Sequence, residues 1–295
     1  MAKDKKLDLS EIANKIRKSF KDDKRSAAVF GTGIDITTPT NPEDFVVLDS
    51  WFKESTGVLG LPFGYICMIA GNSDSLKTAF CIEAMRAAQA QGIYIVLVDS
   101  EKKTTGDRFI QRGVDAKNIA LIRPDFLEEA YDGIDTWLEH IKDADPESKI
   151  LVIFDSLGNT PARAEAETDV NDSLQMGLAA KVNKKGFRRL IPRLGKDKIH
   201  VLVVNQTYEN MGSPGRSNAG GKAVDFFSAL TFQTSRVKWL EKTIKGEQVR
   251  VGARAQWTLY KNHLFSGVPL QKRILLDATS TGISLVNTSD KETDE

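Results

Sequence analysis

The chain has 295 residues, of which 41% are hydrophobic and 27% are charged, and its formal net charge is +1. This composition is that of an ordinary globular protein with one large domain or two small ones. No apolar run approaches the roughly 18 residues that a membrane span requires, so we expect no membrane partner. Because the net charge is close to zero, a polyanionic partner would have to be met by a local basic face.

The two cysteines and three histidines predict neither a disulfide framework nor a metal site. Cys67 falls in an apolar, strand-like run, and Cys81 falls in the helix-like segment that follows. We expect two reduced thiols in the core, which suits a cytoplasm-like compartment. The histidines are scattered without metal-ligand spacing. A metal is therefore expected only together with a bound nucleotide.

The N-terminal part is predicted to be a helix on a tether. Residues 7–20 have the apolar spacing of an amphipathic helix, with Lys and Arg on the opposite face. Residues 21–45 are polar and rich in Thr, Pro, Gly and Asp, which is typical of a linker. Such a helix can dock on its own core or on a neighbouring subunit, and the residues alone leave both open.

From about residue 46, apolar runs of strand length alternate with helical patterns. The expected strands are 65–70, 93–98, 119–122, 150–154 and 199–204, and the expected helices are 78–91, 105–112, 127–141 and 174–194. This alternation predicts an α/β fold with a mostly parallel twisted sheet flanked by helices. Residues 229–285 are richer in strand and are expected to extend the sheet. We therefore predict a helix and linker (1–45), a core (46–285) and an acidic disordered tail (286–295).

The segment from Gly71 to Thr78 has the pattern of a phosphate-binding loop. It follows an apolar run and precedes a helix, which is the context that such a loop needs. Backbone N–H groups of the turn and of the helix N-terminus favour an anion there. Lys77 is expected to reach the β/γ-phosphates, and the Thr78 hydroxyl to hold Mg²⁺. The residues expected around the phosphates are Gly71, Asn72, Ser73, Asp74, Ser75, Leu76, Lys77 and Thr78.

Acids and amides follow three further strands, at the edge of the sheet where ligands bind. Asp155 is expected to support the Mg²⁺, as a Walker-B acid does. Asp99 and Glu101 both qualify by position as the general base for an attacking water. An amide in Asn205-Gln206 is expected to sense the γ-phosphate and to move the long structureless loop 207–221. The segment after Asp155, residues 157–172, is expected to be a second long loop.

A helical run carries Lys181, Lys184, Lys185 and Arg188 at spacings of three, four and seven residues. The spacing places them on one side of the helix, where they would match a nucleic-acid phosphate backbone. A solvated helix face is the usual meaning of such a run, and the composition leaves both interpretations open.

Taken in order, these motifs resemble those of the RecA/UvsX family of strand-exchange recombinases, and most of all its phage UvsX-like branch. The likeness covers about residues 46–285. Each motif is weak alone, whereas eight in the family's order are specific. The motifs are Gly60–Gly64, Gly71–Thr78, Asp99–Glu101, Arg112–Asp115, Asp155–Asn159, Met176–Ala180, Asn205–Glu209 and Gly220–Gly221.

The resemblance implies a P-loop ATPase that uses ATP and Mg²⁺, polymerises through its N-terminal segment, and forms helical filaments on single-stranded DNA for exchange with a homologous duplex. It implies that Glu101 activates water, that Gln206 senses the γ-phosphate, and that the compartment is the host cytoplasm if the chain is phage-encoded. Arg108 stands at an adenine-stacking position, and Lys261 and His263 stand where cations reach the nucleotide of the adjacent subunit. The implied DNA contacts are Met176, Lys181, Arg188, Met211, Gly220 and Gly221.

Four residues depart from the family pattern. Arg108 stands where the family often has an adenine-stacking Tyr, His263 stands where a second cation is expected, and Leu76 and Asp74 lie in the phosphate-binding loop. Leu76 replaces a glycine, and we expect it to fit through a helical φ with its side chain pointing away from the phosphates. Asp74 places a negative charge beside the triphosphate and should weaken binding unless it faces solvent. The alternatives are therefore a RecA-fold paralogue that binds nucleotide and DNA but hydrolyses poorly, as a mediator or scaffold, and a RecA-fold hexameric helicase.

Overall fold

The computed structural model describes residues 8–19, 38–167, 177–209, 216–218, 223–268, 270 and 272–286. The chain divides into two compact units, residues 1–40 and 41–295. In the first unit, helix α1 (Leu9–Ser19) lies within the range expected for an amphipathic helix. Most of the expected linker, and the acidic residues 290–295, lie outside the described residues.

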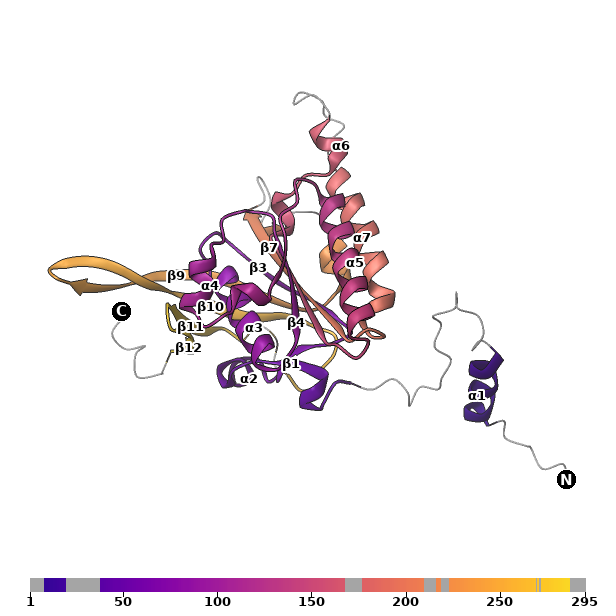
Figure 1. The fold of residues 1–295 in the computed structure, drawn as a ribbon. Coiled ribbons are helices and arrows are strands. Elements are labelled where there is room, and N and C mark those ends of the chain that lie inside the picture. Colours follow the sequence, from indigo (N-terminus) through magenta and orange to yellow (C-terminus); the bar gives the residue numbers. More distant parts are fainter. Residues whose placement is uncertain are drawn as a thin grey trace. The chain divides into compact units, whose positions relative to one another are not determined.

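Among the described residues, a ten-stranded sheet forms the centre of the second unit (Figure 1). Its order is β12-β11-β10-β9-β3-β7-β6-β4-β5, with β8 paired to β7. The strands from β9 to β5 run parallel, and β10, β11 and β12 run antiparallel. The strands of the sheet are β3 (Ile66–Gly71), β4 (Tyr94–Asp99), β5 (Ala120–Ile122), β6 (Ile150–Asp155), β7 (Ile199–Glu209), β8 (Arg216–Asn218), β9 (Ser228–Ile244), β10 (Glu247–Asn262), β11 (Ile274–Thr279) and β12 (Gly282–Leu285). A separate pair joins β1 (Phe45–Val47) to β2 (Gly60–Pro62).

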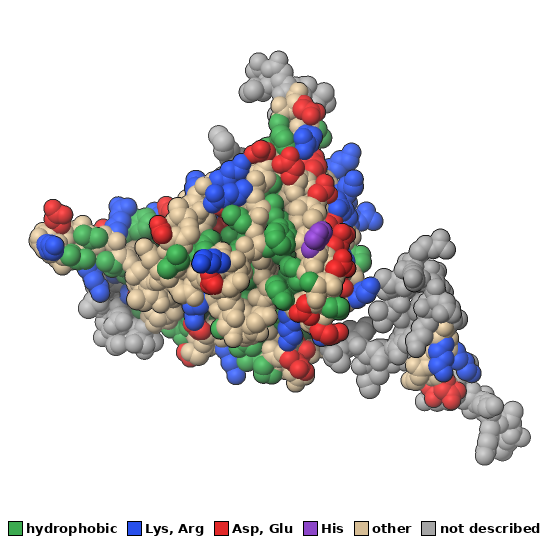
Figure 2. Space-filling model, in the orientation of Figure 1, with side chains coloured by type: hydrophobic (Ala, Val, Ile, Leu, Met, Phe, Trp, Pro, Cys, Tyr) green, Lys and Arg blue, Asp and Glu red, His purple; other side chains and the backbone are tan. Residues whose placement is uncertain are grey.

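Helices cover both faces of this sheet, which confirms the predicted α/β class. The α-helices are α2 (Ser50–Thr56), α3 (Lys77–Ala90), α4 (Gly106–Gln111), α5 (Leu127–Ala144), α6 (Arg163–Ala166), α7 (Leu178–Leu194) and α8 (Ala223–Phe227). The short 3₁₀ turns are η2 (Pro42–Asp44), η3 (Ala116–Asn118) and η4 (Leu157–Asn159). Figure 2 shows acidic side chains along α5 and basic side chains along the neighbouring α7. None of the described helices combines the length and the apolar character of a membrane span.

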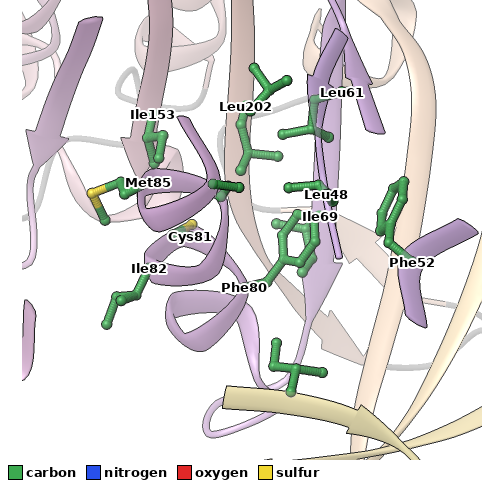
Figure 3. Packing of buried hydrophobic residues seen from close by; sticks show 14 of the residues in the cluster. Leu48, Phe52, Leu61, Ile69, Phe80, Cys81, Ile82, Met85, Ile153 and Leu202 are labelled. Carbon is green, nitrogen blue, oxygen red and sulfur yellow. The ribbon is translucent and has the colours of Figure 1, made fainter. Parts of the chain in front are cut away.

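The strands are apolar on both faces because a separate hydrophobic core lies on each side. Along β6, Leu151 and Ile153 belong to the core beneath α3, whereas Val152 and Phe154 belong to the core beneath α5 and α7. Figure 3 shows Phe80, Cys81, Ile82 and Met85 of α3 packed against residues of β3, β6 and β7. Cys67 and Cys81 are buried free thiols, as expected.

The two segments expected as long loops differ from that expectation in their described parts. After β6 the chain forms η4 and α6, and after residue 206 it remains extended. Residues 207–209 of β7 pair with β8 in antiparallel register, from Thr207 opposite Asn218 to Glu209 opposite Arg216. The prediction of a structureless loop over 207–221 is therefore wrong where the structure describes it, because the backbone hydrogen bonds continue beyond the sheet. Residues 168–176, 210–215 and 219–222 lie outside the described residues.

Strands β9 and β10 form a long hairpin that extends past the sheet (Figure 1). The pairing of β9 with β3 ends at Thr234, opposite Gly71, and the remaining residues of β9 pair only with β10 among the described strands. The hairpin therefore leaves the sheet at the level of the phosphate-binding loop.

His200 is fully buried on β7. Its Nδ1 lies 2.7 Å from the carbonyl oxygen of Pro62, and its Nε2 has no partner among the described residues. Burial lowers the pKa of His200 to about 4, and the hydrogen bond to Pro62 opposes this only in part. The imidazole is therefore neutral at physiological pH.

We expect His200 to make folding sensitive to acid. Between about pH 6.5 and pH 4 the unfolded chain binds this proton and the folded chain does not, so the free energy of unfolding falls as the pH falls. The loss should approach about 3 kcal/mol. The variant His200→Asn, which keeps a donor for Pro62, should flatten this dependence in urea titrations across that pH range. The exposed-residue control His140→Asn should leave it unchanged, and an unaltered dependence in His200→Asn would contradict the assignment.

Candidate nucleotide-binding site

The loop between β3 and α3 is held at the N-terminus of α3 by close backbone packing. A Cβ on Gly71 would lie 2.2 Å from the carbonyl oxygen of Thr234, so only glycine fits where the loop begins. Ser75 Oγ donates to the carbonyl of Asn72 at 2.6 Å, and Thr234 Oγ1 donates to the carbonyl of Ser75 at 2.6 Å. The loop is thus anchored to β9 in front of a helix whose N–H groups favour an anion.

Lys77 begins α3 with a buried side chain that bends back over the loop. Its Nζ donates to the carbonyl oxygens of Gly71 at 2.9 Å and of Asn72 at 2.5 Å. Burial lowers the pKa of Lys77, and the nearby carboxylates of Asp155 and Glu101 oppose this shift. The ammonium group lies within the loop, where a bound phosphate would replace its carbonyl partners.

Leu76 has a left-handed backbone, with φ 72° and ψ −1° at the N-cap of α3. The expectation of a helical φ is therefore wrong, because the chain reverses here to enter the helix. A non-glycine residue in this region costs about 1–2 kcal/mol. The Leu76 side chain is only 8% exposed and lies in the core beneath α3, where burial contributes about 1.5–3 kcal/mol. Packing thus offsets the strain and keeps the side chain in the core.

Because the backbone of Leu76 is left-handed, glycine should give a more stable protein than alanine at this position, which is the reverse of the order in a helix. We expect Leu76→Gly to be more stable than Leu76→Ala by about 1 kcal/mol, because glycine carries no Cβ penalty at positive φ. Both variants should be less stable than the wild type, since both lose the buried side chain. Urea denaturation measures the difference. At the helical position Ala84, glycine should instead cost about 1 kcal/mol, and a Leu76→Ala variant more stable than Leu76→Gly would refute the left-handed assignment.

Asp74 faces solvent and is paired with the hairpin. Its side chain is 65% exposed, and its Oδ2 lies 3.2 Å from Nη1 of Arg236 on β9. Asp74 is exposed but also lines the pocket, so its charge still lies beside the expected phosphates, and the Arg236 cation partly balances it.

Thr78 and Asp155 meet at the point where a metal is expected. Thr78 Oγ1 donates to Asp155 Oδ2 at 3.0 Å. Burial raises the pKa of Asp155 to about 6, the bond from Thr78 lowers it, and the charges of Glu101 and Asp99 raise it further. A cation beside Asp155 would relieve this repulsion.

The chemistry of these donors fits Mg²⁺. A hydroxyl and a carboxylate are hard oxygen ligands, and Mg²⁺ is commonly bound by one or two protein groups together with substrate phosphates. Within the described ranges, no group of three or more His, Cys, Asp or Glu residues could hold a metal alone. A Mg²⁺ ion at Thr78 and Asp155 would therefore depend on the phosphates of a bound nucleotide.

The Glu101 carboxylate accepts hydrogen bonds from several side chains. Its Oε1 accepts from Asn159 Nδ2 at 2.7 Å, Gln206 Nε2 at 3.0 Å and Ser156 Oγ at 3.2 Å, and its Oε2 lies 3.1 Å from Lys103 Nζ. Burial raises the pKa of Glu101, but Lys103 and the other donors lower it more, so the net pKa is below its ordinary value. The carboxylate is ionised at neutral pH.

Asp99, the other candidate for the general base by its position in the sequence, accepts hydrogen bonds from other residues. It is buried, its Oδ2 accepts from Arg123 Nε at 3.1 Å, and its Oδ1 accepts from the backbone N–H of Lys102 at 3.0 Å. Both oxygens of each acid have donors, but Asp99 is buried whereas the Glu101 side chain is 23% exposed, so Glu101 is the acid that a ligand can reach.

These residues line one pocket of about 460 Å³. The phosphate loop, Asp155, Glu101 and Gln206 form one end, because β3 and β7 are in register with Gly71 beside Gln206. Arg108, at the expected base-stacking position, also lines it. Among the lining residues that were not predicted as site residues are four with charged or aromatic side chains, namely Lys103, Arg112, Trp239 and Arg250. For Arg112 the sequence did carry a signal, because it begins the motif Arg112–Asp115 and lies four residues after Arg108.

The remaining predicted residues lie away from this pocket. Lys261, on β10, donates from Nζ to the carbonyl of Asp225 at 2.5 Å, and neither Lys261 nor His263 lines the pocket of its own chain. Lys181 and Arg188 are exposed on α7 and share one shallow surface with Lys184, Lys185 and Arg189. Met176, Met211, Gly220 and Gly221 lie outside the described residues.

The fold and the loop define a P-loop nucleotide-binding α/β protein. The chain matches the RecA N-terminal domain over residues 9–282 and belongs to the RecA family. It is similar to Protein RecA of Ureaplasma parvum serovar 3, with 29% identity over 220 residues that cover 73% of this chain and 62% of that protein. It is also similar to Protein RecA of Gloeothece citriformis (28% over 263 residues, 88% and 69%) and of Mesoplasma florum (26% over 268 residues, 90% and 75%). The chain thus spans less than two thirds of the Ureaplasma protein.

Proposed function

We propose that this chain is a DNA-dependent ATPase that forms helical filaments on single-stranded DNA and exchanges strands with a homologous duplex. The observation that carries the proposal is the 3.0 Å hydrogen bond from Gln206 Nε2 to Glu101 Oε1. This bond joins the carboxylate in the pocket to the strand that continues into residues 207–221. Membership of the RecA family supports the same activity.

In this proposal the pocket binds ATP through the loop. Lys77 and the loop N–H groups bind the β/γ-phosphates, while Thr78 and Asp155 hold Mg²⁺. Bound Mg²⁺ would neutralise charge on the phosphates and orient them. The ionised Glu101 accepts the proton of an attacking water, and Arg108 stacks on the base.

Gln206 would report the state of the pocket to the DNA-binding segment. It pairs with Glu101, and the adjacent Thr207 donates from Oγ1 to Oδ1 of Asn72 in the loop at 3.0 Å. A γ-phosphate that competes for the Gln206 amide would change the partners of β7 directly before its pairing with β8. The nucleotide bound in the pocket would thus affect DNA binding through β7.

Assembly and DNA binding complete the proposal. The N-terminal helix docks on a neighbouring core, and Lys261 and His263 reach the nucleotide of the adjacent subunit, which agrees with their absence from their own pocket. Lys181 and Arg188 bind the DNA backbone, and Met176, Met211, Gly220 and Gly221 contact DNA. We assign the chain to the phage UvsX-like branch because Leu76 replaces the loop glycine.

One observation favours the paralogue that hydrolyses poorly. Lys77 Nζ is bound by two carbonyl oxygens of its own loop, and both bonds compete with a phosphate. A hexameric helicase would share the family fold and differ in assembly.

We expect ATP hydrolysis to increase as single-stranded DNA is added. Glu101→Gln should bind nucleotide normally and hydrolyse it about 10²–10⁴-fold more slowly, because the amide cannot accept the proton. Lys77→Ala should bind no nucleotide, and Glu139→Gln, on the exposed face of α5, should behave as wild type. Normal turnover by Glu101→Gln would show that Glu101 is misassigned. Lack of DNA stimulation in the wild type would favour the poorly hydrolysing paralogue, and closed rings in micrographs the helicase.

Two adjacent arginines on α7 provide a matched test of DNA binding. Arg189 is paired with Asp132 and Asp135 of α5, whereas no ion pair is described for Arg188 in this part of the chain. Arg188→Ala should therefore weaken binding to single-stranded DNA and reduce the slope of log K against log salt by about 0.7. Arg189→Ala should change the slope less. Anisotropy titrations at several salt concentrations measure both, and an unchanged slope for Arg188→Ala would remove Arg188 from the interface.

A further inference from the structure

We propose that Lys103 binds the terminal phosphate of the nucleotide, and that its ammonium group leaves the Glu101 carboxylate for that phosphate when the pocket fills. The inference rests on the proposed ATPase function and adds to its site a cation from the same chain. It is carried by the turn after β4, by the ion pair of Lys103 with Glu101, and by the charges at the phosphate end of the pocket.

The turn that follows β4 presents Glu101 and Lys103 to the same pocket. Lys102, between them, has a left-handed backbone with φ 55°, which is uncommon for a residue other than glycine. The N–H of Lys102 donates to Asp99 Oδ1 at 3.0 Å, and its ammonium group pairs with Asp125. Glu101 and Lys103 line the pocket, whereas Lys102 is not among the lining residues. The turn thus places an acid and a cation beside one ligand, and strained turns of this kind are concentrated at functional sites.

The ion pair between Lys103 and Glu101 is close but exposed. Lys103 Nζ lies 3.1 Å from Glu101 Oε2, and the Lys103 side chain is 76% exposed. The other oxygen, Oε1, accepts from Asn159, Gln206 and Ser156. Exposed ion pairs contribute little free energy, so the ammonium group can leave Oε2 easily. The donors on Oε1 would keep the carboxylate in place.

Glu101 is a poor base while Lys103 is bound to Oε2. An attacking water needs a carboxylate oxygen that is free to accept its proton. Burial raises the pKa of Glu101, and the bond from Lys103 is the main cause that lowers it, so the pair also makes the carboxylate a weaker base. Proton transfer from water therefore favours a state in which Lys103 has another partner.

The terminal phosphate is the stronger partner for Lys103. In the proposed function Glu101 activates the water that attacks this phosphate, so a cation beside Glu101 lies beside the phosphate as well. A phosphate carries more negative charge than a carboxylate and offers three strong acceptor oxygens, so the ammonium group gains by the exchange. Cations around these oxygens are what phosphoryl transfer requires.

Acids outnumber ammonium groups at the phosphate end of the pocket. Asp99, Glu101 and Asp155 line it at or just after the ends of β4 and β6. Lys77, the lysine of the loop, is bound by two carbonyl oxygens of that loop. Lys103 brings a second ammonium group on an exposed side chain. It therefore reduces the repulsion that these acids exert on an incoming triphosphate.

Calorimetry on the full chain tests the exchange with two probes in the presence of Mg²⁺: a non-hydrolysable ATP analogue, and ADP, which lacks the terminal phosphate. Lys103→Met keeps a long side chain and removes its charge. It should weaken binding of the analogue about tenfold or more and leave ADP binding unchanged, which also shows that the variant is folded. Lys103→Arg should retain most of the affinity for the analogue. The matched control Lys102→Met removes the same charge outside the pocket and should behave as wild type with both probes.

A double variant separates contact with the phosphate from an effect through Glu101. In the Glu101→Gln background, Lys103→Met should still weaken binding of the analogue about tenfold, because the phosphate contact does not need the carboxylate. Loss of the effect in that background would show that Lys103 acts only through Glu101, and would overturn the inference.

An unchanged ratio of the two affinities in Lys103→Met would also overturn it, as would an equal loss in Lys102→Met. If the wild type binds both probes and Lys103→Met binds them equally well, only this inference fails. If the wild type binds neither probe, the proposed function fails with it.

Discussion

Negatively charged side chains lie close together at the ends of β4 and β6, and the rest of the site depends on this constraint. The parallel register places Asp99 directly beside Asp155, and Glu101 follows two residues later. Parallel strands that end at one edge must bring such acids together, and a buried carboxylate in their company resists ionisation. Asp155, with its pKa raised to about 6, carries this penalty. Thr78 and Lys77 offset this penalty only in part, so a cation beside Asp155 would stabilise the site.

Most of the framework could be predicted because both sheet faces are buried, so the strands read as continuous apolar runs. The grouping of Lys77, Thr78, Asp155, Glu101 and Gln206 at one edge follows from the same logic, since carboxyl ends of parallel strands meet. The left-handed backbone of Leu76 could not be predicted, because it depends on how the loop enters α3 and on a core contributed by distant segments. The pairing of 207–209 with β8 was missed because its composition is that of a loop.

The hairpin residues were missed for a different reason. Trp239 and Arg250 approach a loop more than 160 positions earlier in the sequence, and only the register of β9 against β3 and β10 brings them there. Period-two alternation assigns a residue to one face of a strand but not to a distance along it. The sequence therefore predicts that these residues form strands. It does not show that the hairpin extends beyond the sheet and lines the pocket.

The phosphate loop has two separate connections, one to β7 and one to the β9–β10 hairpin. On one side Glu101, beside the loop, and Asn72 accept hydrogen bonds from Gln206 and Thr207 of β7, the strand that precedes the segment proposed to bind DNA. On the other side Asp74 is bonded to Arg236, which stacks on Trp239 of the hairpin. A ligand that contacts the loop and the hairpin at once would bias both connections, because each depends on the same loop conformation. Nucleotide binding and the proposed DNA binding would then be linked through the loop, with no contact between the two surfaces required.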